Sequence, residues 1–354
     1  MSNDTPNARR VFWFDDNKKP NVADFLNKDP SIAMHVLAFD APEEDVWPIA
    51  ETSHVYCITS TRDEIPDPYK AHAELLARCP DLLAVSASGA GYDPVDVDAC
   101  TAAGVLVVNQ SGANAQAVAE HATGMMLALT KKMFETDRSL HKERGVFREV
   151  FKGWNAQGKT LGVIGLGNTG RRTAFICAHG LGMKVLAYDP YISPEDFKER
   201  GATSVSLEEL LAQSDFVSIH CPYNAETKDM ICAETLSLMK PSAFLVNCAR
   251  GGIVNEPDLH EALANKTIAG AGIDVWVMEP PPLDHPLLTH DNLIATYHTA
   301  GVTVDSRNNM ARWNAEQVVE ILKGKRPPRL INPEVWDKYA ERFERVFGFK
   351  PEGK

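Results

Sequence analysis

A short glycine-rich run is the feature that most constrains what this chain can fold into. The apolar stretch Thr160 to Ile164 is typical of a strand, and it leads directly into Gly165-x-Gly167-x-x-Gly170. A helix-compatible run, Arg171 to Gly180, follows. Glycines at this spacing permit a tight turn, a close approach of the backbone to a pyrophosphate, and close packing of helix on strand. The unpaired N–H groups at the helix start favour an anion there.

A second strand and an acidic residue extend the pattern. Lys184 to Tyr188 is the next strand candidate, and it ends on Asp189. In a dinucleotide-binding βαβ unit, an acid at this place accepts hydrogen bonds from the adenosine ribose hydroxyls, which favours NAD over NADP. A glycine motif alone could mark a plain turn. The full series of strand, glycines, helix, strand and acid predicts an NAD-binding domain.

Composition limits the partners of the chain. Its 36 basic and 48 acidic residues give a net charge of −12, which argues against nucleic acid and against an anionic membrane. The seven cysteines are scattered without a CxxC pair, so we expect neither a disulfide framework nor a metal site. The N-terminal run Met1 to Pro6 has no apolar signal core, and no apolar stretch approaches the roughly 20 residues of a membrane helix. We therefore expect a cytoplasmic protein.

Strand candidates alternate with helical stretches over 354 residues, which is room for two domains. Such alternation predicts an α/β chain with parallel sheets and crossover helices, among them Pro68 to Arg78 after the capping Asp67. Apart from the two strands already described, the candidates are Val11 to Phe14, Met34 to Phe39, Val55 to Thr59, Leu82 to Ser86, Val105 to Asn109, Phe216 to His220, Ala243 to Cys248, Gly270 to Val275 and Asn292 to Tyr297.

Two long helical stretches suggest where the domains meet in the sequence. One runs from Ala115 to about Gly145 without a proline, and the other from about Ser306 to Lys323. An extended, proline-rich linker (327–333) and a polar helical tail follow, and the tail could be a solvated helix or a subunit contact. We predict that residues 1–116 and 305–354 form a substrate domain and that residues 117–304 form a Rossmann-type dinucleotide-binding domain.

Several further motifs give the chain a recognisable resemblance. In order they are Ser86-Ala-Ser-Gly-Ala-Gly-Tyr-Asp93, Val118-Ala-Glu-His121, the glycine motif with Asp189, His220-Cys-Pro222 with Thr227, Val246-Asn-Cys-Ala-Arg-Gly251, Ala271-Gly-Ile-Asp-Val275 with Glu279-Pro280, Asp284-His-Pro-Leu287 and Thr296-Tyr-His-Thr-Ala-Gly301. With these motifs the chain resembles the D-isomer-specific 2-hydroxyacid dehydrogenase family from about Leu82 to Asn332. The resemblance implies a flavodoxin-like substrate domain beside the Rossmann domain, with substrate bound in the cleft between them.

Three side chains carry the chemistry that this resemblance implies. His298 follows an apolar strand, where ligands of an open parallel sheet bind, and histidine exchanges protons near neutral pH. We predict that it protonates the keto oxygen. The family places Glu279 beside it, where a carboxylate favours the imidazolium; the alternative is a helix-start or surface glutamate. Arg250 is expected to hold the substrate carboxylate rather than form a surface salt bridge.

The other expected contacts concern substrate and cofactor. Backbone N–H groups at Ser88 and Gly89 could bind the substrate carboxylate, or the glycines could serve a tight turn alone. Asp274 resembles the family acid at the nicotinamide end of NAD, or it could be a structural cap. The remaining cofactor-binding positions that the resemblance implies are Asn168, Thr169, His220, Cys221, Pro222, Thr227, Cys248, Ala249 and Gly301, besides the glycine motif, Asp189, Arg250 and His298.

Departures from the family pattern narrow the expected substrate. The family often has Arg-Ile where this chain has Asn168-Thr169, which keeps the backbone N–H groups. Phosphoglycerate-oxidising members often carry an arginine at Thr59-Ser60; it is absent here, although Arg62 lies near. Glu279 argues against the formate-oxidising branch. We predict an NADH-preferring homodimer that acts on a small acid of the glyoxylate or hydroxypyruvate type. The alternatives are an NAD(H)-sensing corepressor-like regulator and a dehydrogenase of a phosphorylated hydroxy acid.

Overall fold

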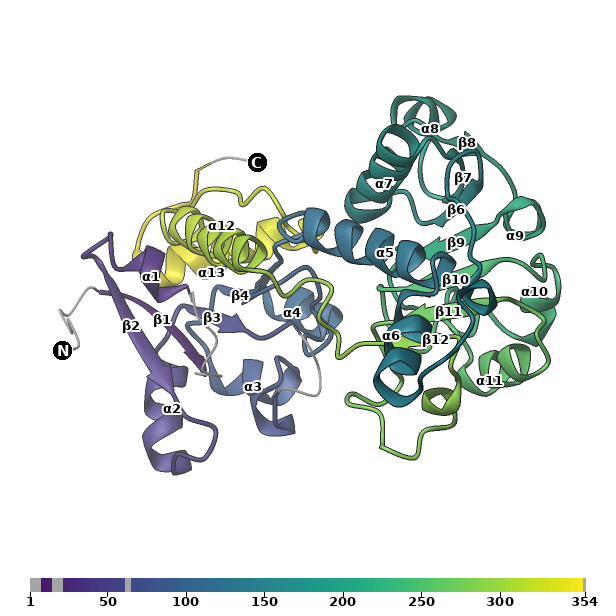
Figure 1. Ribbon diagram of the computed structural model, residues 1–354. Coiled ribbons are helices and arrows are strands. Elements are labelled where there is room, and N and C mark those ends of the chain that lie inside the picture. Colours follow the sequence, from purple (N-terminus) through teal and green to yellow (C-terminus); the bar gives the residue numbers. More distant parts are fainter. Residues whose placement is uncertain (1–7, 15–21, 61–64, 353–354) are drawn as a thin grey trace. The chain divides into compact units, whose positions relative to one another are not determined.

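The computed structural model describes residues 8–14, 22–60 and 65–352, and the chain forms two compact units (Figure 1). The first comprises Met1–Asn114 and Val304–Lys354, and the second comprises Ala115–Thr303. Arg62 and the N-terminal run Met1 to Pro6 lie outside the described residues. No helix in the described part of the chain combines the length and the apolar character needed to cross a membrane.

The first unit is built on a parallel sheet of five strands in the order β2-β1-β3-β4-β5. This order is that of flavodoxin-like folds, as the resemblance implied. The strands are β1 (Arg9–Phe14), β2 (Ile32–Leu37), β3 (Val55–Ile58), β4 (Ala84–Ala87) and β5 (Leu106–Val108). The inner strands β3 and β4 and the short β5 are wholly buried, which is expected where helices cover both faces of a parallel sheet, whereas the edge strand β2 is half buried.

Alternate residues of these strands supply two separate cores in the first unit. Phe12 and Tyr56 face one side, where they pack with α2 (Glu43–Glu51), α3 (Ala73–Arg78) and α4 (Val97–Ala103). Val11 and Val55 face the other side, where the core includes residues of α1 (Ala23–Leu26), α12 (Val304–Leu322) and α13 (Trp336–Phe347). The end of the chain therefore covers one face of a sheet formed by its beginning (Figure 1).

The C-terminal helix corrects one expectation. The tail looks polar, yet α13 buries Trp336, Tyr339 and Phe343 in the core of the first unit. Arg342 on the same helix donates hydrogen bonds to three backbone carbonyls, those of Cys79, Leu82 and Ala103, at 2.6–2.9 Å. The tail is thus an integral part of the first unit, because a few large aromatic residues at helical spacing outweigh its polar composition.

The second unit holds a parallel sheet of seven strands in the order β12-β11-β10-β9-β6-β7-β8. Counted from β6, this is the doubly wound 3-2-1-4-5-6 order of dinucleotide-binding domains with one further strand beyond it. The strands are β6 (Thr160–Ile164), β7 (Lys184–Tyr188), β8 (Thr203–Ser204), β9 (Phe216–Ile219), β10 (Phe244–Asn247), β11 (Gly270–Ile273) and β12 (Leu293–Ala295). The order reverses between β6 and β9, beside which such folds bind their ligands.

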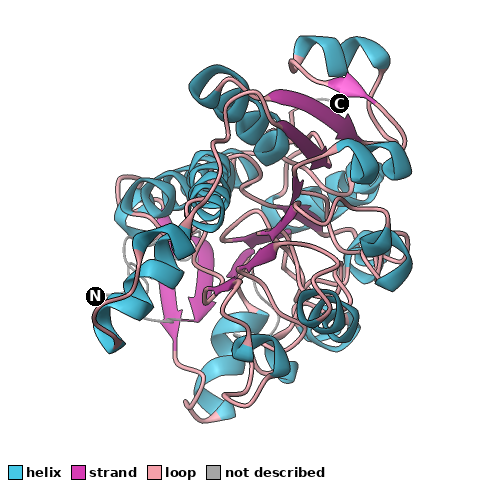
Figure 2. Ribbon diagram, turned by 45° about the vertical axis from the view of Figure 1, so that its right-hand side comes forward, coloured by secondary structure: helices cyan, strands magenta, loops and turns pink. Residues whose placement is uncertain are grey.

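Helices cover both faces of this second sheet (Figure 2). One core packs residues of α5 (Ala115–Thr130), α7 (Asn168–Phe175), its π-helical extension η4 (Ile176–Gly180) and α8 (Pro194–Glu199) against the sheet. The opposite core packs residues of α9 (Leu207–Gln213), α10 (Ala233–Ser237) and α11 (Glu256–Ala264). Short 3₁₀ turns in the described part of the chain include η2 (Asp67–Tyr69), η3 (Arg148–Phe151), η5 (Pro286–Thr289) and η6 (Pro333–Val335).

Two expected helices are interrupted. The stretch from Ala115 to about Gly145 is divided into α5 and α6 (Met133–Lys142), because Lys132 between them adopts a left-handed backbone with φ of 53°. The stretch from Pro68 to Arg78 begins as η2 and becomes helical again only in α3. Neither break carries a proline or glycine at its turning point, so no local sequence signal marks it. All seven cysteines are free thiols.

Candidate active site

The expected site residues of the second unit lie at one edge of its sheet. Each follows the carboxyl end of a strand: Gly165 follows β6, Asp189 follows β7, His220 follows β9, Cys248 to Arg250 follow β10, Asp274 follows β11 and His298 follows β12. Because all seven strands are parallel, these ends meet at the same edge. Ligands of open α/β sheets bind at this edge.

The three motif glycines occupy three different environments. Gly165 has a φ of +85° and lies so close to the next loop that a Cβ would be 2.7 Å from the Cys221 nitrogen. At Gly170 a Cβ would be 1.9 Å from the Gly165 carbonyl oxygen, so the helix start packs directly on the turn. Gly167, at the N-cap of α7, faces open space. This arrangement leaves room for a pyrophosphate above the first turn of α7 and fits a dinucleotide.

Asp189 braces the same loop. Its carboxylate accepts hydrogen bonds from the Leu166 N–H at 2.9 Å and from the Tyr191 N–H at 3.1 Å. The side chain is only partly buried, so the carboxylate keeps access to solvent. Asn168 and Thr169 begin α7, and the Asn168 side chain accepts a hydrogen bond from Arg171 at 2.8 Å. Asp189 thus stands at the end of the second strand of the βαβ unit, beside the glycine turn and with an accessible carboxylate.

His298 and Glu279 form a direct hydrogen bond. The distance from His298 Nδ1 to Glu279 Oε2 is 2.8 Å, and the two side chains are 32% and 19% exposed. The second oxygen of Glu279 accepts a hydrogen bond from the Trp276 N–H at 3.0 Å. Since Nδ1 faces the carboxylate, the other ring nitrogen of His298, Nε2, is the atom that can exchange a proton with a substrate.

The surroundings of Glu279 keep it ionised. Burial alone would raise the pKa of its carboxyl group, but the hydrogen bond and charge of His298, the Trp276 N–H and the charge of Arg250 outweigh burial and lower it. The Arg250 guanidinium is therefore near enough to act on this carboxylate. Arg250 also donates to the Ala249 carbonyl at 2.7 Å, and its own carbonyl accepts from the Asn247 side chain. The side chains of His298, Glu279 and Arg250 therefore lie close together at this edge of the sheet.

Asp274 is fully buried and holds the turn that carries His298. Its oxygens accept hydrogen bonds from the Thr299 N–H at 2.8 Å, the Ala300 N–H at 2.9 Å and the Thr296 hydroxyl at 2.5 Å. Its backbone carbonyl accepts from the His298 N–H at 2.7 Å. His298 itself has a φ of 52°, a left-handed conformation that costs on the order of 1 kcal/mol and persists only where the surroundings impose it.

The loop after β9 supplies the next group of predicted residues. His220 Nε2 lies 2.9 Å from the Ser218 hydroxyl, while its Nδ1 is buried without a hydrogen-bond partner among the described residues. Burial lowers the pKa of His220 to about 4 and raises that of the Cys221 thiol to about 11. Thr227 is buried and donates to the Pro222 carbonyl at 2.8 Å, which shapes the loop from within.

The remaining predicted residues lie in two places. Cys248 is buried and Ala249 and Gly301 are partly buried at the edge described above. Ser88 and Gly89 belong to the first unit, at the end of β4. The Ser88 N–H is already donated to the Ile58 carbonyl at 2.8 Å, so this group is not available to bind an anion as expected.

Sequence reasoning missed two features behind this edge. Glu256, at the start of α11, lies 3.2 Å from His285 and forms a second acid–histidine pair. His121 from α5 joins Cys248 and Asp274 in a group whose potential metal-ligand atoms lie within 4.8 Å of one another. The hydrogen bonds that Asp274 already accepts, and the burial that raises the pKa of Cys248, make this group a poor metal site. Both features join segments far apart in sequence, which no local motif reveals.

Comparisons with known proteins show the family to which the chain is similar. Residues 123–300 match the family model of the NAD-binding domain of D-isomer-specific 2-hydroxyacid dehydrogenases. The chain is 40% identical over 255 residues to a D-3-phosphoglycerate dehydrogenase of Archaeoglobus fulgidus, which covers 72% of this chain but 48% of that protein. It is 39% identical over 267 residues to a glyoxylate reductase of Korarchaeum cryptofilum, covering 74% of this chain and 80% of the relative.

The length of the relatives and a solved structure complete the comparison. The chain spans about half the length of the phosphoglycerate dehydrogenases that it matches. Among solved structures, the D-lactate dehydrogenase of Aquifex aeolicus, in complex with NAD and lactic acid, matches with a TM-score of 0.77 at 28% identity. That match covers 91% of this chain and 98% of the other. The likeness thus extends to both units.

Proposed function

This chain belongs to the D-isomer-specific 2-hydroxyacid dehydrogenase family, and from that premise we propose that it is an NAD(H)-dependent enzyme that interconverts a small D-2-hydroxy acid and its 2-keto acid. The observation that carries the proposal is the 2.8 Å hydrogen bond between His298 and Glu279, beside Arg250, at the ligand-binding edge of a dinucleotide-binding sheet. An acid–histidine pair with a nearby guanidinium suits the reduction of a carbonyl next to a carboxylate.

Each of these residues would have a separate task. Arg250 binds the substrate carboxylate and orients the keto group. His298 gives the proton on Nε2 to the keto oxygen during reduction, and takes it back during oxidation. Glu279, ionised by its surroundings, stabilises the imidazolium and sets the ring orientation through Nδ1. When bound, NADH supplies the hydride that reaches the 2-carbon.

The cofactor would be held by the backbone of the second unit. We propose that the pyrophosphate lies over Gly167, Asn168 and Thr169 at the start of α7, and the adenosine ribose beside Asp189. A carboxylate at that position repels a 2′-phosphate, so NADH is preferred over NADPH. Asp274 acts through the turn it holds, and the nicotinamide contact predicted for it would be made by that turn, which includes Gly301.

The substrate is proposed to be a small acid of the glyoxylate or hydroxypyruvate type. The glyoxylate reductase relative, of which the chain covers 80%, supports this choice. A phosphorylated hydroxy acid is the second candidate, because the matching phosphoglycerate dehydrogenases reach 40% identity. Glu279 and the partial exposure of His298 fit either acid.

A panel of keto acids tests both candidates. NADH oxidation would be followed by absorbance with glyoxylate, hydroxypyruvate, pyruvate, phenylpyruvate and a phosphorylated keto acid, with NADPH as a comparison. We expect NADH-dependent turnover of a small unphosphorylated acid that is lost in His298→Ala. Tight NADH binding without turnover of any acid would favour the corepressor-like regulator instead.

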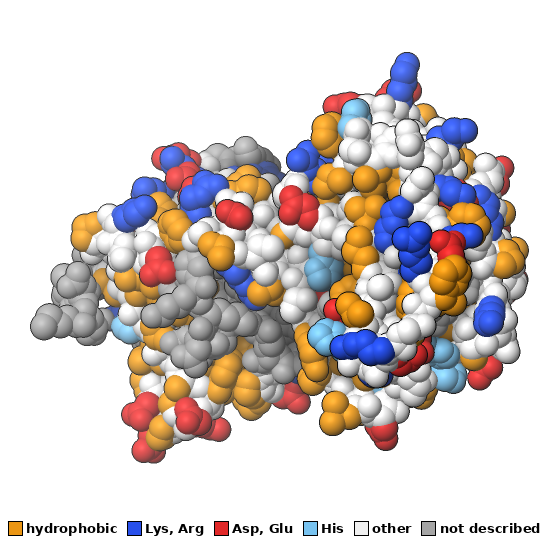
Figure 3. Space-filling view, viewed as in Figure 1, with side chains coloured by type: hydrophobic (Ala, Val, Ile, Leu, Met, Phe, Trp, Pro, Cys, Tyr) orange, Lys and Arg blue, Asp and Glu red, His pale blue; other side chains and the backbone are white. Residues whose placement is uncertain are grey.

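A second copy of this chain is the partner that we propose. Helix α6 buries none of its residues, and large apolar side chains are exposed on it and on the segment that follows: Met133, Phe134, Leu140, Val146, Phe147, Val150 and Trp154. Figure 3 shows hydrophobic side chains beside basic ones on this face of the second unit. Exposed apolar groups gathered in one segment are typical of an interface.

Phe147→Glu should convert a homodimer to a monomer in light scattering after size-exclusion chromatography. An unchanged mass would contradict this interface.

A further inference from the structure

Glu256 and His285 form a second acid–histidine pair in the second unit, besides that of Glu279 and His298. Glu256 Oε2 lies 3.2 Å from His285 Nε2, and both side chains are largely buried. His285 Nδ1 accepts a hydrogen bond from the Leu287 N–H, so Nε2 carries the proton and donates it to Glu256. We propose that Glu256 and His285 are positioning residues that hold Glu279 in place beside His298, an inference that rests on the proposed dehydrogenase function.

Two glutamates together hold the backbone that leads to Glu279. The Trp276 N–H is donated to Glu279 at 3.0 Å, and the next N–H, that of Val277, is donated to Glu256 at 2.8 Å. The side chains of Val277 and Met278 are 57% and 66% exposed, so apolar packing does little to fix this segment. Its position therefore depends on hydrogen bonds, and Glu256 supplies one of them.

The same carboxylate links the loop of Arg250 to the loop of Glu279. The chain runs from Arg250 through Gly251 and Gly252 to Glu256, which begins α11. A Cβ on Gly251 would be 1.9 Å from the Trp276 carbonyl oxygen, so the two loops are in direct backbone contact. Glu256 thus ties both loops to the start of one helix.

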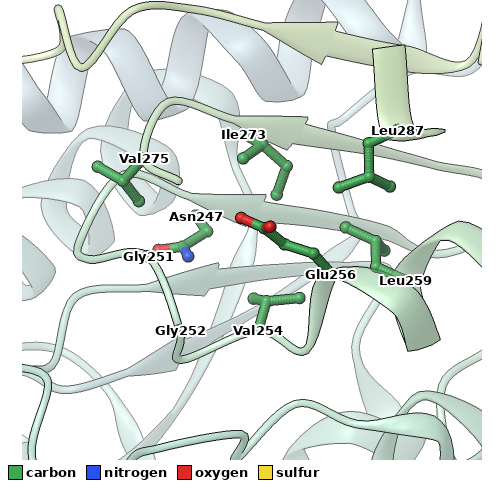
Figure 4. A pocket seen from close by; sticks show the side chains of 9 residues that line it. All are labelled: Asn247, Gly251, Gly252, Val254, Glu256, Leu259, Ile273, Val275 and Leu287. Carbon is green, nitrogen blue, oxygen red and sulfur yellow. The ribbon is translucent and has the colours of Figure 1, made fainter. Parts of the chain in front are cut away.

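The cavity beside Glu256 excludes a ligand-binding role for it. Figure 4 shows the Glu256 side chain pointing into a small cavity lined by Asn247, Gly251, Ile273 and Leu287. Its volume is about 10 Å³, which is room for about one water molecule and none for a substrate. The carboxylate consequently acts on the protein and not on a bound acid.

His285 extends the support to the segment between β12 and His298. Its ring meets the Trp276 indole edge-on, with centroids 5.5 Å apart at an interplanar angle of 75°. The indole N–H of Trp276 is donated to the Thr296 carbonyl at 3.0 Å. A continuous set of contacts therefore leads from Glu256 through His285 and Trp276 to the backbone two residues before His298.

Glu256→Gln tests the proposal with little change in shape. The glutamine oxygen can accept only one of the two hydrogen bonds, because its NH₂ group meets the other donor. We expect kcat to fall on the order of tenfold through misplacement of Glu279, with the KM for the keto acid and the Kd for NADH within about twofold of wild type. The matched control is Glu261→Gln on the exposed side of the same helix, which should behave as wild type. A fall in Tm and in NADH affinity together, without a selective effect on kcat, would indicate a merely structural role and overturn the proposal.

A double-mutant cycle tests whether Glu256 acts through Glu279. If it does, the double variant Glu256→Gln with Glu279→Gln should have nearly the kcat of Glu279→Gln alone, because the same interaction is removed by either change. If the two changes lower kcat independently, so that their effects on the activation free energy add, Glu256 does not act through Glu279 and the proposal is overturned.

A measurement without turnover separates this inference from the proposed function. The imidazole ¹⁵N resonances of His298, identified by their loss in His298→Gln, report the contact at Nδ1. At pH 7 they should shift in Glu256→Gln and remain in place in Glu261→Gln. Inactivity of the wild-type protein toward every keto acid would contradict the dehydrogenase function while leaving this test intact. Unshifted resonances in Glu256→Gln would overturn the positioning role even in an active enzyme.

Discussion

The orientation of the His298 ring and the conformation of its backbone are both set by neighbouring residues. Its ring is oriented by Glu279, and its left-handed backbone is imposed by the hydrogen bonds that Asp274 accepts from the residues after it. Neither partner is close in sequence, yet both follow β11, the strand paired with the one that precedes His298. The proton transfer that we propose for His298 would thus depend on the register of two adjacent parallel strands.

Glu279→Gln should lower kcat by one to two orders of magnitude, because the imidazolium loses its charged partner. The pKa of Glu279 is lowered from its ordinary value, so the wild-type carboxylate stays ionised through the neutral range, where the deficit of the variant should be constant. Only as the pH falls through this lowered pKa does the wild-type carboxyl group gain its proton, and the two enzymes should then converge. Activity measured from pH 4 to 9 checks this. The exposed Glu234→Gln serves as control, and a deficit that grows toward acid pH would contradict the expectation.

His220 should make the protein less stable in acid. Its pKa is about 4 when folded, against an ordinary 6.5, so the unfolded chain binds more protons between these values. The free energy of unfolding should therefore fall as the pH drops from 6.5 to 4, by at most about 3 kcal/mol for this group. His220→Gln should reduce that fall in urea titrations at pH 7 and 4.5. The exposed His141→Gln should leave that fall unchanged. If the free energy of unfolding falls equally in wild type and in His220→Gln, the low pKa of His220 is refuted.

At the scale of the element, we expect two glycines in the turn from β6 into α7 to have different roles, one in packing and one in cofactor binding. Gly170→Ala should destabilise the fold by about 1–3 kcal/mol, because the new Cβ meets the Gly165 carbonyl. Gly167→Ala should fold normally, since a Cβ there faces open space, but should weaken NADH binding by obstructing the pyrophosphate. Thermal unfolding and fluorescence titration with NADH check both variants. Normal NADH affinity in Gly167→Ala would contradict the placement of the pyrophosphate at this position.

The elements differ in how well the sequence predicts them. β6 and β7 have the predicted bounds, because glycine and charged residues enclose each apolar run. β8 was missed, since its two residues are exposed and offer no apolar pattern. The break at Lys132 was also missed, because lysine is common within helices and its left-handed backbone is set by tertiary packing.

The residues of the candidate site also differ in how well the sequence predicts them. His298, Glu279 and Arg250 were predicted because each stands in a recognisable motif at a strand end. Glu256 and His285 were not, because their contact joins the start of a helix to a loop 29 residues later. The occupied Ser88 N–H likewise depends on β3, a strand that no local pattern connects with it.

For the whole molecule, the two units have cores of their own, and we expect them to have separate tasks. The predicted cofactor-binding residues belong to the second unit, whereas Arg342 stabilises the first through three backbone carbonyls. Arg342→Met should leave those carbonyls without donors and lower the stability of the first unit by about 2–4 kcal/mol, while the Kd for NADH stays unchanged. Calorimetry and NADH titration of the variant check this. Arg345→Met, at an exposed position on the same helix, is the control, and a parallel loss of NADH affinity would contradict the separation of tasks.

The return of α12 and α13 to the first unit has a consequence for synthesis. The ribosome delivers β1 to β5 first, yet the helices that cover one face of their sheet emerge only after the whole second unit. The nascent first unit must therefore wait with apolar strand residues uncovered, while the stretch from Ala115 to Thr303, contiguous in sequence, has everything it needs to fold as it leaves the exit tunnel. The second unit can therefore complete its fold before the first unit does, although synthesis of the first unit begins earlier.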